Sequence, residues 1–128
     1  MFTIEQIQEA HSKVKSGADF PNYIRDLKKL GVSFYQTYVN DGHTDYYGET
    51  YKTSSPARYK PLAIAGSCNT DLFKSCLSDH QQGKTDYPAF IKLCADTGVE
   101  NWEVCLDTMT CTYYDSDGNK VLTENIPG

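Results

Sequence analysis

The chain has 128 residues, of which 39% are hydrophobic and 23% are charged. This balance is typical of a globular protein and excludes a disordered or collagen-like chain. The length suits one domain, so we expect residues 1–128 to fold as a single unit. The net charge of −5, from 12 basic and 17 acidic residues, argues against general nucleic-acid binding, which needs an excess of Lys and Arg. No apolar run reaches the roughly 18 residues that span a bilayer, so we expect no membrane contact.

The opening residues and the cysteines both indicate a cytoplasmic protein. Residues 1–5 contain neither the basic nor the apolar part of a signal peptide. The five cysteines are odd in number and form no CxxC pair, which favours reduced thiols over a disulfide framework. We therefore expect a cytoplasmic location, with five reduced and mostly buried cysteines.

The first half of the chain begins with two predicted helices. Thr3 and Gln6 have the spacing of a capping box, so a helix is expected to begin there. This helix is predicted to end at residues 16–17, Ser-Gly. A second helix is predicted to begin at Asp19, acting as the N-cap, and to end at Gly31.

Strands are predicted to follow these two helices. Residues 32–39 are β-branched and aromatic, which favours a strand. Residues 40–42, Asn-Asp-Gly, are a typical hairpin turn, and the return strand is expected over residues 44–52. Residues 53–56 are predicted to form a loop, and residues 62–65 a short third strand.

The second half predicts the same kinds of element in the same order. A third helix is expected to be capped by Asn69 or Thr70 and to end at Gly83, and a fourth should run from Asp86 to Gly98. The apolar face of the third helix is predicted to comprise Leu72, Phe73, Cys76, Leu77 and His80. Three further strands are expected over residues 101–107, 110–115 and 120–124.

A shift of 67 residues places the second half on the first. The matched pairs include Asp19 with Asp86, Gly31-Val32 with Gly98-Val99, and Tyr35 with Trp102. We therefore predict an α+β protein with four helices packed on one face of a mainly antiparallel sheet. It would be built as two related α-α-β-β(-β) halves, about 1–65 and 66–128. The alternative is that constrained caps and turns make two unrelated units look alike.

Two patterns suggest metal sites but have simpler explanations. Cys76 and His80 are four residues apart on a predicted helix, a spacing that suits zinc, but both continue its apolar face. Residues 115–119 begin like a calcium loop, but their glycine is fourth where an EF-hand needs it sixth, so we expect a hairpin turn. We therefore expect no metal and no other cofactor.

Residues 51–61 form a basic segment in an otherwise acidic chain, because they contain no Asp or Glu. Lys and Arg attract anions or an acidic partner, and tyrosine rings can stack on a ligand. The candidate binding residues are Lys52, Arg58, Tyr59 and Lys60. An ordinary solvated loop is the alternative interpretation.

Four sequence motifs connect the chain to a known family: HQQG at 80–83, TDY at 85–87, GVENW at 98–102 and MTCTYYD at 109–115. With these motifs the chain resembles the YdfO/YbcV-like family over nearly its whole length. These are small bacterial proteins of unknown function, some carried on prophages and sometimes labelled phage envelope proteins. The resemblance implies no activity, cofactor or catalytic residue.

These observations favour a non-enzymatic binding or regulatory module in the cytoplasm. We expect it to contact a protein partner through strand tyrosines and the basic segment. A small-molecule or anion-binding domain, with a pocket between the two halves, is the alternative. A cysteine-dependent enzyme using Cys94, Cys105 or Cys111 is the third interpretation, although no sequence signature marks a nucleophile. The identity of the partner and the oligomeric state stay open.

Overall fold

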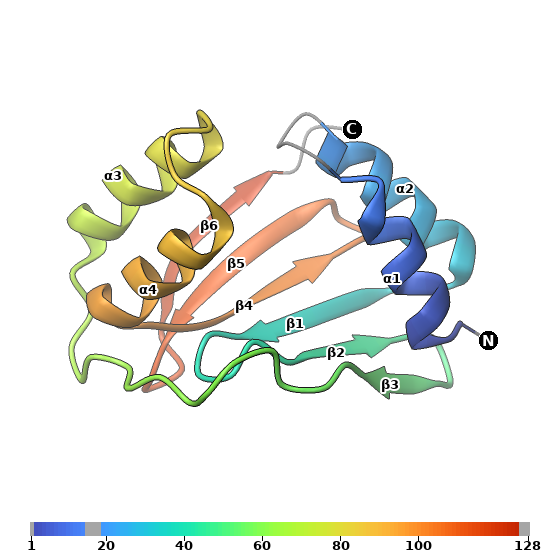
Figure 1. Cartoon of the computed structure of the whole chain (residues 1–128), viewed down its shortest axis with the longest axis horizontal. Coiled ribbons are helices and arrows are strands. Elements are labelled where there is room, and N and C mark those ends of the chain that lie inside the picture. Colours follow the sequence, from blue (N-terminus) through green and yellow to red (C-terminus); the bar gives the residue numbers. More distant parts are fainter. Residues whose placement is uncertain (1, 15–18, 126–128) are drawn as a thin grey trace.

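The computed structural model describes residues 2–14 and 19–125. Six strands form one antiparallel sheet in the order β3-β2-β1-β4-β5-β6, and four helices cover one of its faces (Figure 1). The elements are α1 (Ile4–Ser12), α2 (Phe20–Leu30), β1 (Phe34–Tyr38), β2 (Thr44–Tyr47), β3 (Lys52–Ser54), α3 (Thr70–Gln81), α4 (Tyr87–Thr97), β4 (Val99–Cys105), β5 (Thr110–Asp115) and β6 (Lys120–Asn125). The predicted α+β class is confirmed. None of the helices in the described ranges has the length and apolar character needed to cross a membrane.

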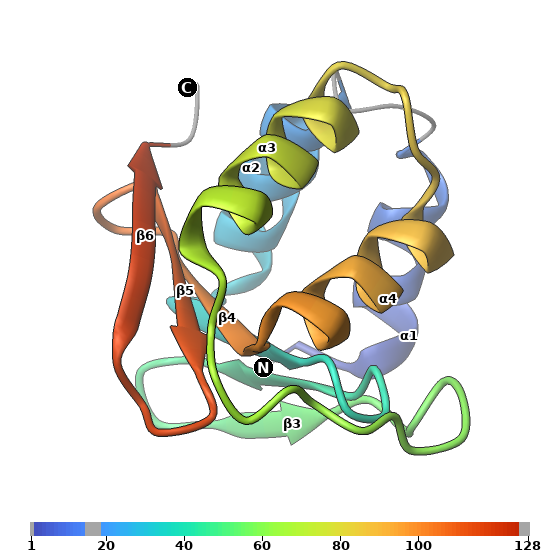
Figure 2. The ribbon, with the colours of Figure 1, turned by 90° about the vertical axis from the view of Figure 1, so that its left-hand side faces the viewer.

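The sheet is curved, and the helices lie on its concave side (Figure 2). Helices α1 and α2 cover one end of the sheet, and α3 and α4 cover the other end. All four helices of the described residues lie on the concave side, so no described helix covers the opposite, convex face.

Local side-chain chemistry begins two of the helices as predicted. The Thr3 hydroxyl accepts a hydrogen bond from the Gln6 backbone N–H at 3.2 Å, and the Gln6 side chain accepts one from the Thr3 N–H at 2.9 Å, which confirms the capping box. The Asn69 side chain caps α3 by accepting from the Leu72 N–H at 3.1 Å. Helix α1 ends at Ser12. Its predicted end at residues 16–17 lies outside the described residues.

The starts of α2 and α4 differ, although both were predicted to have an Asp cap. The Asp86 carboxylate accepts a hydrogen bond from the Ala89 backbone N–H at 2.9 Å. Asp19 occupies the same position in α2, but its backbone is already helical and its side chain makes no capping hydrogen bond to that helix. The prediction that Asp19 caps α2 through its side chain is therefore wrong. Both helices end, as predicted, at a left-handed glycine, Gly31 or Gly98.

The predicted return strand over residues 44–52 is wrong in its length. It is interrupted after Tyr47, where the Gly48 backbone N–H donates to the Tyr51 carbonyl at 2.6 Å. The chain then turns back, and residues 52–54 pair with β2 as the edge strand β3. Gly-Glu-Thr at positions 48–50 has low strand preference, which explains why the ladder breaks there.

Residues 62–65 do not form the predicted third strand. The Leu62 backbone N–H donates to the Asn40 carbonyl at 2.7 Å, whereas the Ala65 N–H donates to the Ala95 carbonyl at 2.9 Å. These two bonds tie the segment to two different parts of the molecule. A strand needs a continuous ladder with one neighbour, so the segment is an irregular connection between the halves.

The buried apolar side chains form one cluster drawn from both halves. The prediction for the apolar face of α3 is correct for Phe73 and Leu77, which are buried, but wrong for Leu72, which is 49% exposed. Leu72 lies one position before Phe73, so the helical rotation turns it away from the sheet.

Each half of the chain contributes two helices followed by three strands. At the centre of the sheet Gln36 in β1 lies opposite Glu103 in β4, a pair that the shift of 67 makes equivalent. The hairpins agree as well, because Tyr35 lies opposite Tyr46 and Trp102 opposite Tyr113. The outer strands do not follow the shift, because Tyr46 lies opposite Thr53 whereas Tyr113 lies opposite Leu122 and not Lys120. The origin of the two halves by duplication stays a prediction.

Candidate functional site

The convex face of the sheet is the candidate site, and we call it the open face. Side chains alternate between the two faces of a strand, and residues opposite each other on paired strands share a face. Tyr35, Thr37 and Val39 are buried, so the residues between them point away from the helices. By this alternation and the strand registers the open face comprises Phe34, Gln36, Tyr38, Asp45, Tyr47, Lys52, Ser54, Asn101, Glu103, Cys105, Thr110, Thr112, Tyr114, Thr123 and Asn125.

Aromatic side chains occupy several strand positions on the open face. The rings of Phe34 and Tyr47 stack with their centroids 4.3 Å apart, and the Lys52 ammonium lies 5.3 Å from the centroid of Tyr47. The Tyr38 ring stacks on His43 at 4.5 Å. Each of these rings is partly exposed, so one side of it remains available for contact.

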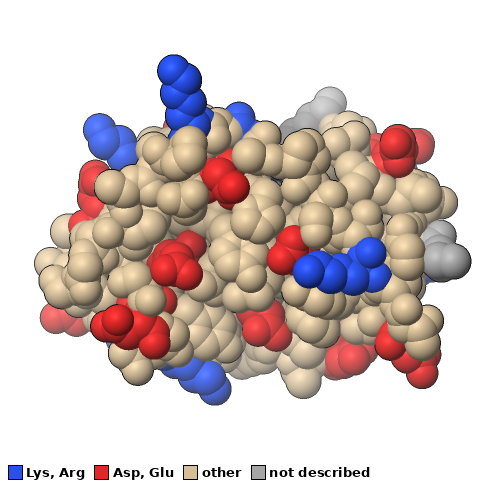
Figure 3. Space-filling model, turned by 90° about the horizontal axis from the view of Figure 1, so that it is seen from below, with Lys and Arg blue, Asp and Glu red and all other residues tan. Residues whose placement is uncertain are grey.

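Carboxylates lie near the Tyr38 ring and make this part of the surface acidic. Partial burial raises the pKa of the Tyr38 hydroxyl, and the negative charges of Asp45, Glu100 and Glu103 raise it further. Figure 3 views the molecule from the side of the open face and shows acidic groups spread over a largely uncharged surface, with few basic ones. The Lys52 ammonium lies 3.9 Å from the Asp45 carboxylate.

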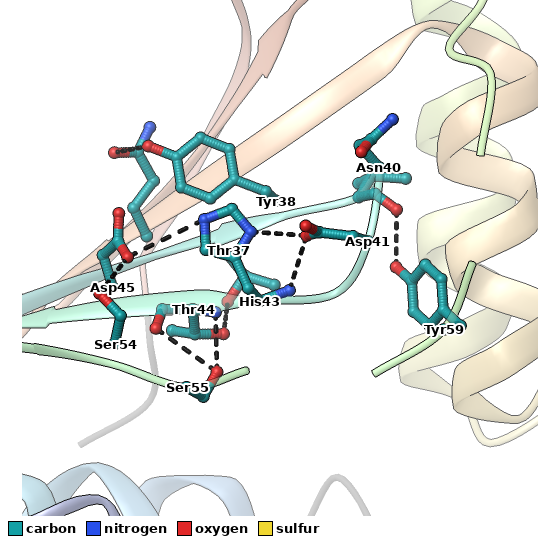
Figure 4. A network of polar contacts seen from close by, with 12 residues as sticks. Thr37, Tyr38, Asn40, Asp41, His43, Thr44, Asp45, Ser54, Ser55 and Tyr59 are labelled. Carbon is teal, nitrogen blue, oxygen red and sulfur yellow. Dashed lines mark hydrogen bonds and ion pairs between the residues drawn. The ribbon is translucent and has the colours of Figure 1, made fainter. Parts of the chain in front are cut away.

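The turn between β1 and β2 holds a histidine between two carboxylates (Figure 4). Asp41 Oδ1 accepts a hydrogen bond from the His43 backbone N–H at 3.0 Å and lies 2.5 Å from Nδ1 of its ring. These two hydrogen bonds lower the pKa of Asp41. His43 Nε2 lies 3.9 Å from Asp45, whose carboxylate also accepts from the Ser54 hydroxyl at 2.6 Å. The His43 ring is thus fixed in orientation against Tyr38.

The structure does not bring the four candidate binding residues into one site. Lys52 belongs to the open face, whereas the Arg58 side chain lines a cavity beside α1, on the helix side of the sheet. The Tyr59 hydroxyl donates to the Val39 carbonyl at 2.6 Å, and burial, the main cause, raises its pKa to about 12. Lys60 is exposed. The basic segment is therefore divided between two surfaces.

The thiols are all unpaired, and none of them is fully exposed. Cys94 is fully buried and the other four cysteines are partly buried, which agrees in part with the prediction of mostly buried cysteines. Burial raises the pKa of Cys94 well above that of a free thiol and raises the pKa of Cys111 to about 12. A nucleophilic cysteine needs a lowered pKa, so these two thiols have the opposite character.

The Cys76 and His80 pair has no further ligand around it in the described part of the chain. His80 Nδ1 lies 3.1 Å from the Thr85 carbonyl oxygen, and the His80 ring stacks on Phe90 at 4.3 Å. Across residues 2–14 and 19–125, no three His, Cys, Asp or Glu side chains are placed to share a metal ion. The environment of His80 is that of a packed ring at the edge of the core.

Comparison with known proteins adds a family but no activity. Residues 8–125 match the profile of a family described as "Protein of unknown function (DUF1398)". The chain belongs to this family. No curated protein matches it. Membership in DUF1398 agrees with the expected uncharacterised family.

Sequence reasoning on this DUF1398 chain missed the carboxylates near Tyr38, of which Asp45 and Glu103 lie on the open face. Asp45, Glu100 and Glu103 stand in different strands or far apart in sequence, and only the pairing of β1 with β2 and β4 brings them around Tyr38. A signal was present in the alternation of residues 44–47. There Tyr46 turns inward, and Asp45 and Tyr47 turn outward together.

Proposed function

We propose that the protein is a non-enzymatic binding module that contacts a protein partner through the open face. The observation that supports this most directly is the set of partly exposed aromatic rings on a sheet face that carries no helix. Aromatic residues are enriched at the centres of protein interfaces, whereas a face that only meets water is usually polar. Tyrosine suits such a surface because its ring packs while its hydroxyl stays hydrated.

The charge of the open face indicates the chemistry of the partner. A Lys or Arg side chain can lie over a tyrosine ring and pair with a neighbouring carboxylate at the same time. Within the chain, Lys52 already makes this contact, 5.3 Å from the ring of Tyr47 and 3.9 Å from Asp45. The carboxylates around Tyr38 offer the same combination to an incoming cation. The proposed partner therefore presents a segment rich in Lys or Arg.

Charge reversal on the open face tests this proposal. The immobilised wild-type chain and the variant Glu103→Lys are each incubated with an extract of the native host, and the captured proteins are quantified by mass spectrometry. Glu9→Lys is the matched control, because it makes the same change in net charge on the exposed side of α1. We expect a set of proteins that wild type and Glu9→Lys capture equally and that Glu103→Lys captures at least tenfold less.

A second variant separates the role of the aromatic rings from that of the charge. Tyr38→Ser leaves the net charge unchanged and removes the ring that the carboxylates surround, so it should also lose the captured set. Capture that is the same for Glu103→Lys and for wild type would show that the open face is not the contact surface. A captured partner that binds through an acidic segment would contradict the proposed chemistry.

The proposal also includes a cytoplasmic location and a prophage origin for the protein. A cytoplasmic location is supported by the five unpaired thiols, since an oxidising compartment would favour disulfides. Kinship with the YdfO/YbcV-like proteins and a prophage origin are supported by the motifs quoted above. Mass spectrometry of the native protein without reductant, and the nature of the genes on either side, test these two points. Disulfides, or neighbours with no phage functions, would contradict them.

A further inference from the structure

A second candidate site lies on the opposite side of the sheet, between α1 and strand β2. It is a cavity of about 300 Å³ beside residues 55–58. One wall is apolar and includes Ile4 and Ile7 from α1. Arg58, His11 and Tyr46 contribute the polar groups. By volume the cavity has room for roughly ten water-sized groups, enough for a small organic molecule.

Arg58 carries the one permanent charge among the described residues that line this cavity. Among the described residues no carboxylate lies within ion-pairing distance of it. The Arg58 charge affects the two neighbouring rings. Burial lowers the pKa of His11, and the Arg58 charge lowers it further. Burial raises the pKa of Tyr46, and the Arg58 charge partly opposes this rise. Arg58 is thus an exposed residue that lines the cavity, and no carboxylate of the described residues neutralises its charge.

The corresponding groove in the second half of the chain provides an internal comparison. It lies between α3 and β6 and contains both Lys74 and Glu124. The Glu124 carboxylate accepts a hydrogen bond from the Gln81 side chain at 2.9 Å. This groove therefore supplies its own anion, whereas the groove at α1 does not.

We propose that the cavity at α1 binds a small organic carboxylate, with its charged group at Arg58 and His11 and its apolar part against Ile4 and Ile7. A guanidinium presents two parallel N–H donors that match the two oxygens of a carboxylate. The cavity offers one fixed positive charge and an apolar wall. That combination suits a singly charged amphipathic molecule better than a doubly charged phosphate.

Nuclear magnetic resonance (NMR) titration of the full ¹⁵N-labelled chain with sodium benzoate tests this inference. Inorganic phosphate and benzyl alcohol serve as the doubly charged and uncharged comparisons. We expect saturable shifts of the amides of His11, Ser55 and Arg58 with benzoate, and binding at least tenfold weaker for each comparison compound. Arg58→Gln should weaken benzoate binding at least tenfold, whereas Lys60→Gln, an exposed position on the same loop, should not change it.

A third variant covers the case in which Arg58→Gln fails to fold, as judged from its amide spectrum. Gln8→Trp places a large side chain on the exposed side of α1 at the cavity and leaves Arg58 intact, so it should also abolish the shifts. The inference is overturned if benzoate produces no saturable shifts or if it binds Gln8→Trp as it binds wild type. It is equally overturned if a folded Arg58→Gln binds benzoate like wild type, or if phosphate or benzyl alcohol binds as tightly as benzoate.

Discussion

Two glycines have the same backbone conformation, but replacing them is expected to cost different amounts of stability. Gly31 and Gly98 both end a helix with positive φ, 101° and 94°. A Cβ added to Gly31 would meet no atom within 4 Å, but at Gly98 it would lie 2.5 Å from the carbonyl oxygen of Ser67. Gly31→Ala should therefore lose only the backbone preference, about 1 kcal/mol, and Gly98→Ala should lose clearly more because the backbone at residues 67–68 must move.

Urea unfolding of the two alanine variants measures this difference as a change in the midpoint at constant slope. Destabilisation of the same size in both variants would contradict the crowding described around Gly98.

The Tyr59 hydroxyl makes stability depend on alkaline pH. Its pKa is raised to about 12 from the ordinary 10.0, mainly by burial, and it donates to the Val39 carbonyl. Between pH 10 and pH 12 the folded chain keeps a proton that the unfolded chain loses, so the free energy of unfolding falls as the pH rises through this range. Tyr59→Phe should be about 1 kcal/mol less stable at neutral pH and should show a shallower fall above pH 10.

Denaturant titrations at several alkaline pH values compare the two proteins. The thiols of Cys94 and Cys111 also have raised pKa values and contribute equally to both curves. If the two curves run parallel above pH 10, Tyr59 is not the source of the dependence.

At the level of whole elements, the start of α4 provides a test of capping. Asp86 accepts a hydrogen bond from the first turn of α4, through the Ala89 backbone N–H. We expect Asp86→Ala to cost about 1 kcal/mol of stability and Asp86→Asn, which keeps a capping oxygen, to cost less than half as much. Thermal unfolding of both variants measures the difference, and an equal loss would show that the capping bond is not the cause.

Elements that depend on hydrogen bonds between nearby residues could be predicted from the sequence. Elements that depend on hydrogen bonds to residues far along the chain could not. The starts at Thr3 and Asn69 follow from side chains that bond to the next turn of the same helix. Residues 62–65 have strand-like composition, but their hydrogen bonds go to Asn40 and Ala95, which no local pattern reveals.

The candidate site follows the same rule. Alternation predicted which residues of a strand share a face, but the open face depends on which side of the sheet the helices cover. The cavity at Arg58 required the loop to fold back toward α1, a contact between positions about fifty residues apart. The sequence therefore identified Lys52 and Arg58 as candidate binding residues. It could not show that Lys52 lies on the open face and that Arg58 lines the cavity on the other side of the sheet.

For the whole molecule, the shared core predicts a single cooperative unit. The buried cluster contains residues from both halves, and β1 pairs with β4 across the middle of the sheet. We propose that residues 1–128 form one domain, so calorimetric unfolding should show one transition whose calorimetric and van't Hoff enthalpies agree. Two separable transitions, or a fragment of residues 66–128 that folds alone, would contradict this.

The claim that the open face binds a partner is tested most directly by fluorine NMR. The tyrosines are replaced by 3-fluorotyrosine, and the partner captured from the host extract is added. We predict that the signals of Tyr38 and Tyr114, which lie on the open face, shift or broaden, while those of Tyr59 and the buried Tyr46 stay in place. If Tyr59 responds and Tyr38 and Tyr114 do not, the partner binds away from the open face and the proposed function is wrong.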